Sequence, residues 1–290
     1  MYKLVHCAAL RRKSNLPTTC GPKISAGFRS GSDRRVGAGP CAFARSGALA
    51  LLCYAALIAG LWLMPSQAAL AAPDCVILLH GLASDSESMR PLSRYLQQLG
   101  YLVINVDYPS TERSIQVLAA AALPAAVAQC PPDRTVNFVT HSLGGILVRQ
   151  YLRATPLDRL GRVVMLGPPN GGSQVVDAMG YLGLYRFIRA PAGWQINARP
   201  TSLPNQLGGV DYPVGIVAGA RSDNRILSWL LPSFDDGMVS VSNTRLEGML
   251  DHIVMPLSHG GLTRDRAVFE QCDAFLKSGH FDRGAMVASN

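Results

Sequence analysis

A serine that could act as a nucleophile lies at residue 142, inside the segment THSLG at 140–144. A buried apolar strand is expected over 136–139, just before this segment, and an amphipathic helix over 143–154, just after it. So tight a turn between strand and helix strains its central residue and exposes that side chain above the carboxyl edge of the sheet. Ser142 is therefore the candidate nucleophile, and the alternative is a loop serine that only caps the helix.

A serine hydroxyl reacts slowly unless a base within hydrogen-bond reach takes its proton, and the base needs a carboxylate to orient it. When the serine lies on such a turn, the acid and then the histidine follow it along the chain. His259 lies in the loop between the last predicted strand and the final predicted helix, where the base is expected. His252 begins that strand and His280 follows that helix, so both are poorly placed. His141 adjoins the serine, but its side chain is expected to point away.

The acid is expected in a loop that follows the predicted strand 214–218. Asp236 is the favoured residue, because Gly237 and two apolar residues follow it and form a sharp turn that can aim a carboxylate inward. Asp223 and Asp235 are the alternatives, and each could instead be a solvated loop charge.

The negative charge that develops on the oxygen of an acyl group needs hydrogen-bond donors. One expected donor is the backbone N–H of Leu143, the residue after the serine. The second is that of Leu82, in the loop after the first predicted strand, 75–79. His80 and Gly81 begin this loop, and we expect His80 to hold the loop in place rather than to react.

The scaffold that must position these residues alternates strands and helices from residue 75 onward. Such alternation predicts an α/β fold, with a mostly parallel, doubly wound sheet and helices on both of its faces. The predicted strands span 75–79, 102–106, 136–139, 162–166, 214–218 and 253–256, and the predicted helices span 87–99, 114–129, 143–154 and 265–277.

The alternation stops at about 168–210, where the chain is rich in proline, glycine and aromatic residues. An irregular insertion of this length in a compact domain is usually a lid or a binding loop. A second small core packed on the edge of the sheet is the other interpretation, and the two are compatible.

Basic residues concentrate near the start of the chain. Residues 1–47 hold nine lysines and arginines and one acidic residue, and the remainder holds 18 residues of each sign. The formal net charge of +8 therefore does not indicate a nucleic-acid-binding surface on the folded domain.

An uncharged apolar run at 48–64 follows the basic segment, and small residues follow the run up to Pro73. This order is typical of a secretory signal peptide. We expect 1–72 to be a leader and 73–290 to be a domain that is periplasmic or secreted after cleavage. The alternative is an uncleaved anchor that associates with the inner membrane through 48–64.

Five segments together resemble the α/β-hydrolases, specifically their small bacterial lipase- and esterase-like branch. They are HGLASDSESMRPL at 80–92, FVTHSLGG at 138–145, MLGPPNGGS at 165–173, FDDGMV at 234–239 and LSHGG at 257–261. The resemblance covers about residues 74–280 and implies the α/β-hydrolase fold. It assigns Ser142, Asp236 and His259 to a catalytic triad and the loop His80-Gly81-Leu82 to the oxyanion hole.

The chain departs from the family pattern at several points. Thr140 stands where the serine motif usually has its first glycine, and Asn170 stands where many lipases have histidine. The first two of the family's eight strands are not evident, so a shortened sheet is expected. The family's strand order makes the strands beside Cys75 and Cys130 neighbours, which implies a disulfide between them. Cys272 is expected to be a buried helix residue.

The activity implied by the resemblance is hydrolysis of carboxylic esters, through an acyl-enzyme and without a cofactor. The substrate would be a small-molecule or lipid ester with an apolar acyl chain, because the segment 168–210 is apolar and aromatic. A thioesterase or acyltransferase could use the same residues, and a non-catalytic binding protein of the cell envelope is the third possibility. The chain contains no C-x-x-C pair, so a structural zinc site is not predicted.

Overall fold

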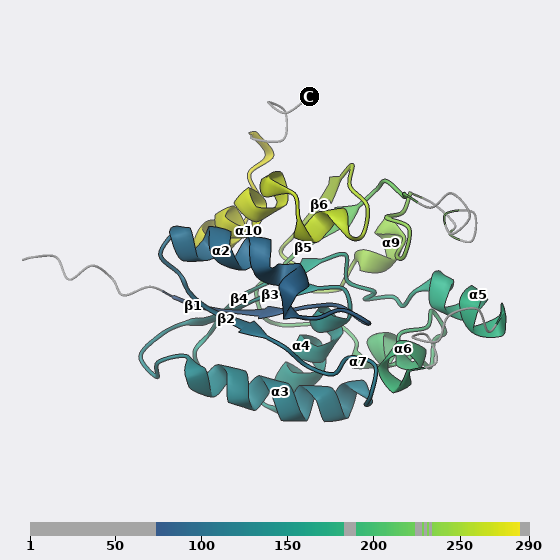
Figure 1. Cartoon of the computed structure of the whole chain (residues 1–290), viewed down its shortest axis with the longest axis horizontal. Coiled ribbons are helices and arrows are strands. Elements are labelled where there is room, and N and C mark those ends of the chain that lie inside the picture. Colours follow the sequence, from purple (N-terminus) through teal and green to yellow (C-terminus); the bar gives the residue numbers. More distant parts are fainter. Residues whose placement is uncertain (1–73, 183–189, 224–227, 229–230, 232–233, 285–290) are drawn as a thin grey trace, which may run out of the picture. The chain divides into compact units, whose positions relative to one another are not determined.

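One parallel six-stranded sheet organises residues 74–182, 190–223, 228, 231 and 234–284, the part of the chain that the computed structural model describes (Figure 1). The strands lie in the order β2-β1-β3-β4-β5-β6, and every neighbouring pair is parallel. Their bounds are β1 Cys75–Leu79, β2 Leu102–Val106, β3 Val136–His141, β4 Leu160–Leu166, β5 Val214–Gly219 and β6 Asp251–Met255. The six predicted strands and the shortened sheet are confirmed, with ends that differ by a few residues.

Helices cover both faces of this sheet (Figure 1). One face carries α2 (Arg90–Gln98) and α10 (Arg266–Ser278), and the other carries α3 (Ile115–Gln129) and α4 (Leu143–Ala154). Alternate residues of β1 enter the two cores, so Ile77 packs with α3 and α4 while Leu78 packs with α2. Burial on both sides explains why this strand is continuously apolar.

Short helices also form in the segment between β4 and β5, which the sequence predicted to be irregular. They are α5 (Gln174–Leu182), α6 (Pro191–Gln195) and α7 (Leu203–Leu207), and residues 183–189 lie outside the described residues. Prolines begin α6 and follow the first residue of α7. Proline has the backbone angle of a helix and lacks only an N–H that the first turn leaves unpaired, so it starts helices as well as ending them. The remaining short elements are η1 (Ser86–Met89), α9 (Val241–Thr244) and η2 (Gly261–Thr263).

The expected leader lies outside this description. Contacts divide the chain into Met1–Ser66 and Gln67–Asn290, and every described residue belongs to the second unit. The leader 1–72 and its apolar run 48–64 are among the residues that the structure does not describe. Within the described ranges, no helix has both the length and the apolar character needed to cross a membrane.

A disulfide joins Cys75, at the start of β1, to Cys130, which follows the last residue of α3. The two Cα atoms are 5.8 Å apart, and 55 positions separate the residues along the chain. The bond therefore closes the segment that contains β2, α2 and α3 into a covalent loop. Cys272 is a buried free thiol in α10, as expected from its spacing.

Replacing Cys75 and Cys130 together by serine is expected to lower the free energy of unfolding by about 4 kcal/mol, from the chain entropy that a loop of this length removes. Urea denaturation followed by circular dichroism measures the change. A reductant should lower the midpoint of the wild-type protein in the same way and should leave the double variant unaffected. Equal midpoints for oxidised and reduced wild-type protein would contradict this account.

Candidate active site

Ser142 occupies a strained turn between β3 and α4. Its φ of 52° and ψ of −119° lie where residues with a Cβ are rarely found. Its N–H donates to the carbonyl of Leu166 at 2.9 Å, and its carbonyl accepts from the N–H of Gly145 at 3.0 Å. A Cβ on Gly144 would lie 2.8 Å from the carbonyl oxygen of Leu79, so only glycine fits there. These contacts hold the serine at the carboxyl edge of the sheet.

The turn also accommodates Thr140, the departure from the family's first glycine. This side chain is fully buried, and its Oγ1 donates to the carbonyl of Val164 at 3.4 Å. A Cβ on Gly145 would lie 3.3 Å from Thr140 Oγ1. The glycine after the motif therefore provides the space that the threonine needs.

His259 and Asp236 form a hydrogen-bonded pair in the loops that follow β6 and β5. Nδ1 of His259 lies 2.7 Å from Oδ2 of Asp236, and the N–H of His259 donates to the carbonyl of Asp236 at 2.9 Å. The other carboxylate oxygen accepts from the N–H groups of Met238 at 3.0 Å and Val239 at 2.8 Å. The Asp-Gly turn thus aims the carboxylate inward, and the Asp236 side chain is fully buried.

The alternative acids make other contacts. The carboxylate of Asp235 accepts from the N–H of Gly237 at 2.7 Å, which caps the turn. Asp223 is exposed and pairs with Arg221 at 3.5 Å. The alternative base His252 has its Nε2 2.9 Å from Oγ1 of Thr244, which is a structural contact.

His141 contradicts the prediction that it would point away from the site. Its Nε2 lies 3.0 Å from the backbone oxygen of His259, and the two imidazole rings are 4.6 Å apart. The reason is that β3 continues through His141, so the side chain follows the pleat of the strand. Val139, two residues earlier, packs in the core beside α10, so His141 points toward the loop that precedes α10. Burial and the nearby His259 lower the pKa of His141 to about 3.

The loop after β1 is held by His80 and by Tyr108, a residue that sequence analysis did not identify. The two rings stack with their centres 4.1 Å apart, and the hydroxyl of Tyr108 donates to the carbonyl of His80. Nδ1 of His80 lies 2.8 Å from the carbonyl oxygen of Gly81, to which it donates. Burial lowers the pKa of His80, so this ring is neutral. Further along, the N–H of Ala83 donates to Oγ of Ser110 at 3.0 Å.

A small cavity of about 90 Å³ brings the candidate residues together. Ser142, His141, His259 and Leu82 all line it. Leu143 is the first residue of α4, so its N–H belongs to the helix turn that has no intrahelical acceptors. The loop after β4, helix α5 and the residue that follows α6 also contribute to the wall, through Pro169, Ser173, Val176 and Ile196. The insertion therefore forms part of the wall of the candidate site.

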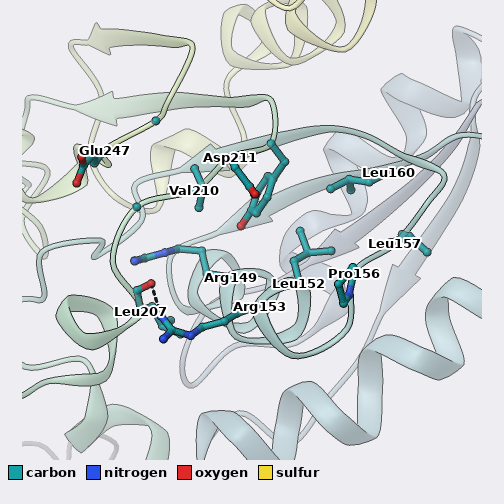
Figure 2. A pocket seen from close by; sticks show the side chains of 13 residues that line it. Arg149, Leu152, Arg153, Pro156, Leu157, Leu160, Leu207, Val210, Asp211 and Glu247 are labelled. Atoms are coloured by element: carbon teal, nitrogen blue, oxygen red, sulfur yellow. Dashed lines mark hydrogen bonds between the residues drawn. The ribbon is translucent and has the colours of Figure 1, made fainter.

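A larger cavity of about 920 Å³ lies between the C-terminal half of α4 and the chain that precedes β5 (Figure 2). Arg149 and Arg153 both extend from α4 into its wall (Figure 2). Arg149 is buried, and burial lowers its pKa to about 10. It donates to Oδ1 of Asn170 at 3.1 Å and to the carbonyl of Pro204 at 2.9 Å. Asn170 therefore serves to join α4 to the insertion.

Metal ligands are not clustered in the described part of the chain. No group of three or more histidine, cysteine, aspartate or glutamate side chains there could hold a metal ion.

Comparison with known proteins identifies the family to which this fold belongs. Residues 76–287 match the model of the alpha/beta hydrolase family. No curated protein sequence matches the chain. The mature form of the lipase BlEst2 from Bacillus licheniformis is similar at 19% identity and a TM-score of 0.54, over 73% of this chain and 94% of that one. The metagenomic carboxyl esterase MGS0156 is similar at 19% identity and a TM-score of 0.52, over 65% of each chain. The esterase PF2001 of Pyrococcus furiosus is similar at 19% identity and a TM-score of 0.52, over 71% of this chain and 82% of that one.

Proposed function

This chain belongs to the alpha/beta hydrolase family, and from that premise we propose that it is a serine hydrolase that cleaves carboxylic esters. One observation carries the proposal: the carboxylate of Asp236 lies 2.7 Å from Nδ1 of His259, and His259 lines one cavity with the strained Ser142. The similar lipase and esterase structures support the hydrolase fold on which this arrangement is built.

The acylation step begins when Oγ of Ser142 attacks the carbonyl carbon of the ester while Nε2 of His259 takes the hydroxyl proton. The backbone N–H groups of Leu82 and Leu143 donate to the oxyanion of the tetrahedral intermediate. Asp236 holds His259 in the tautomer that leaves Nε2 free to accept. The bond between the acyl carbon and the alcohol oxygen then breaks, and His259 gives its proton to that oxygen, so that the alcohol departs.

Deacylation repeats these steps with water as the nucleophile. His259 takes a proton from water as its oxygen attacks the acyl carbon, and the same two N–H groups stabilise the second oxyanion. The bond between the acyl carbon and Oγ of Ser142 breaks, and the proton on His259 returns to the serine. The products are one carboxylic acid and one alcohol per ester consumed.

A short acyl chain is the expected preference. The described walls bound about 90 Å³, which is small beside the roughly 300–1,000 Å³ of pockets that bury a drug-sized ligand. Longer chains must displace Val176 or Ile196, and forcing extra methylenes into a packed space costs about 1–3 kcal/mol. We expect kcat/KM for p-nitrophenyl esters to be highest from acetyl to butyryl and to fall at least about tenfold at octanoyl.

The control for this prediction is Ile196→Ala, which enlarges the cavity and should move the optimum to longer chains. A kcat/KM that rises steadily up to dodecanoyl in the wild-type protein would contradict the short-chain preference and would indicate a lipase.

Export from the cytoplasm is part of the proposal. The disulfide between Cys75 and Cys130 supports it, because such bonds persist mainly in oxidising compartments. Cell fractionation followed by mass spectrometry of the N-terminus tests it. Protein in the periplasm or medium that begins near Pro73 would indicate cleavage, whereas membrane-bound protein that retains 48–64 would indicate an anchor.

Labelling with a fluorophosphonate probe tests the proposed activity directly, because such probes react with activated serines. We expect an adduct on the peptide that contains Ser142, together with release of acid and alcohol from a p-nitrophenyl ester. Transfer of the acyl group to an added alcohol in preference to water would instead identify an acyltransferase. Folded protein that is neither labelled nor active would contradict the proposal and favour a binding role in the cell envelope.

A further inference from the structure

His141 is a buried titratable side chain that lines the cavity and that the proposed reaction does not use. Its Nε2 lies 3.0 Å from the backbone oxygen of His259. A carbonyl oxygen only accepts hydrogen bonds, so Nε2 carries the proton and Nδ1 carries a bare lone pair. Within the described residues, Nδ1 has no hydrogen-bond partner. The tautomer of His141 is therefore set by the backbone of the residue proposed as the base.

The opposite edge of the same ring lies against the loop after β1. A Cβ placed on Gly81 would be 3.0 Å from Nδ1 of His141 and 3.2 Å from Cβ of Ser142. A side chain at Gly81 would therefore crowd the ring in this position. The imidazole of His141 thus lies where three parts of the site meet: the nucleophile turn, the oxyanion loop and the base loop.

The sheet itself provides no direct link between the nucleophile and the base. Ser142 follows β3, while His259 follows β6, and two other strands lie between these two in the sheet. The contact between His141 and His259 spans 118 positions of the chain and crosses this gap. The rings also pack on each other, with centres 4.6 Å apart and planes at 48°.

We propose that His141 is a positioning residue of this reaction: its Nε2–H holds the backbone of His259, and its ring keeps the base loop in place beside Ser142. The inference rests on the proposed function, because it assigns His259 as the base. A displacement of about 1 Å in a reacting group can cost about 10²-fold in rate, so a link of this kind affects turnover more than substrate binding.

The neutrality of His141 fits this role. During acyl transfer His259 becomes a cation, and a second positive charge in contact with it would oppose that change. Burial lowers the pKa of His141 to about 3, so its ring holds the base loop without charge.

Three variants test the proposal. In His141→Gln, the amide nitrogen lies as many bonds from Cβ as Nε2 does, so it can still donate to the carbonyl of His259. In His141→Asn, the amide nitrogen lies one bond closer to Cβ and cannot reach, and His141→Leu removes the donor. We expect the asparagine and leucine variants to lower kcat by about 10- to 100-fold, with KM changed less than about threefold. The glutamine variant should retain kcat within about fivefold of the wild type.

The measurements are kcat and KM with p-nitrophenyl butyrate and the rate of fluorophosphonate labelling, beside the melting temperature of each variant. Wild-type kcat in all three variants would overturn the proposal. The proposal would also be overturned if all three variants showed the same decrease in kcat, the same increase in KM and the same decrease in melting temperature. Such a result would indicate a purely structural histidine. Active wild-type protein with unaffected variants would leave the proposed function standing, whereas inactive, unlabelled wild-type protein would overturn both.

Discussion

Replacement of Ser142 by alanine is expected to lower kcat for a short-chain ester by about 10⁴-fold or more, as removal of the nucleophile does in other serine hydrolases. The change removes the attacking oxygen and leaves the backbone of the turn intact, so no acyl-enzyme can form. Residual turnover would come from the oxyanion donors and from substrate binding alone. Steady-state hydrolysis of p-nitrophenyl butyrate, with the melting temperature as a test of folding, measures the effect.

The matched control is Ser278→Ala, because Ser278 is an exposed serine at the end of α10 and does not line this cavity. Its kcat should stay within about threefold of the wild-type value, as is usual for a change away from the reacting groups. Retention of more than a few per cent of activity in folded Ser142→Ala protein would show that another residue provides the nucleophile.

Replacement of Asp236 by asparagine is expected to have the second large effect. It should lower kcat by about 10³- to 10⁴-fold. The N–H groups of Met238 and Val239 donate to Oδ1 of Asp236, so the amide oxygen of the variant should take that place. The NH₂ group would then face Nδ1 of His259, which now has to accept. His259 would carry its proton on Nε2 and could no longer take one from Ser142.

The control for this prediction is Asp223→Asn, which alters the exposed carboxylate that sequence analysis kept as an alternative acid. We expect its kcat to stay within about threefold of the wild-type value, because surface changes of this kind are usually small. Comparable losses in the two variants would mean that the acid has been assigned to the wrong residue. The comparison uses kcat at a fixed pH and requires both proteins to be folded.

The sheet and the pair of loop residues were predictable because their signals are local. Continuous apolar runs such as 75–79 can be buried on both faces only between two layers of helices, which defines a parallel sheet. Asp236 was identified because glycine follows it, and Gly237 indeed has a positive φ of 95° in the turn. His259 was identified by elimination, since it lies at the carboxyl end of the last strand.

The contacts that the sequence could not predict depend on how distant segments meet. The direction of the His141 side chain depends on whether β3 ends at Val139 or continues to His141. The last residues of this strand are polar, so the apolar pattern of the sequence does not show where the strand ends. Tyr108 follows the end of β2, and only the pairing of β2 with β1 places it against His80. Arg149 and Asn170 are polar residues whose burial follows from the packing of α4 against the insertion.

The covalent loop closed by Cys75 and Cys130 makes the stability of the folded chain depend on whether its compartment is oxidising or reducing. A contribution of about 4 kcal/mol corresponds to about a thousandfold change in the ratio of unfolded to folded molecules. In a reducing compartment the unfolded fraction of the same chain would be larger by that factor, and the chain would be correspondingly easier to transport in an unfolded form or to degrade. After oxidation, the closed loop would protect the enzyme from proteases. The disulfide thus affects how long the molecule persists, whereas the residues proposed for catalysis lie at the opposite ends of the strands.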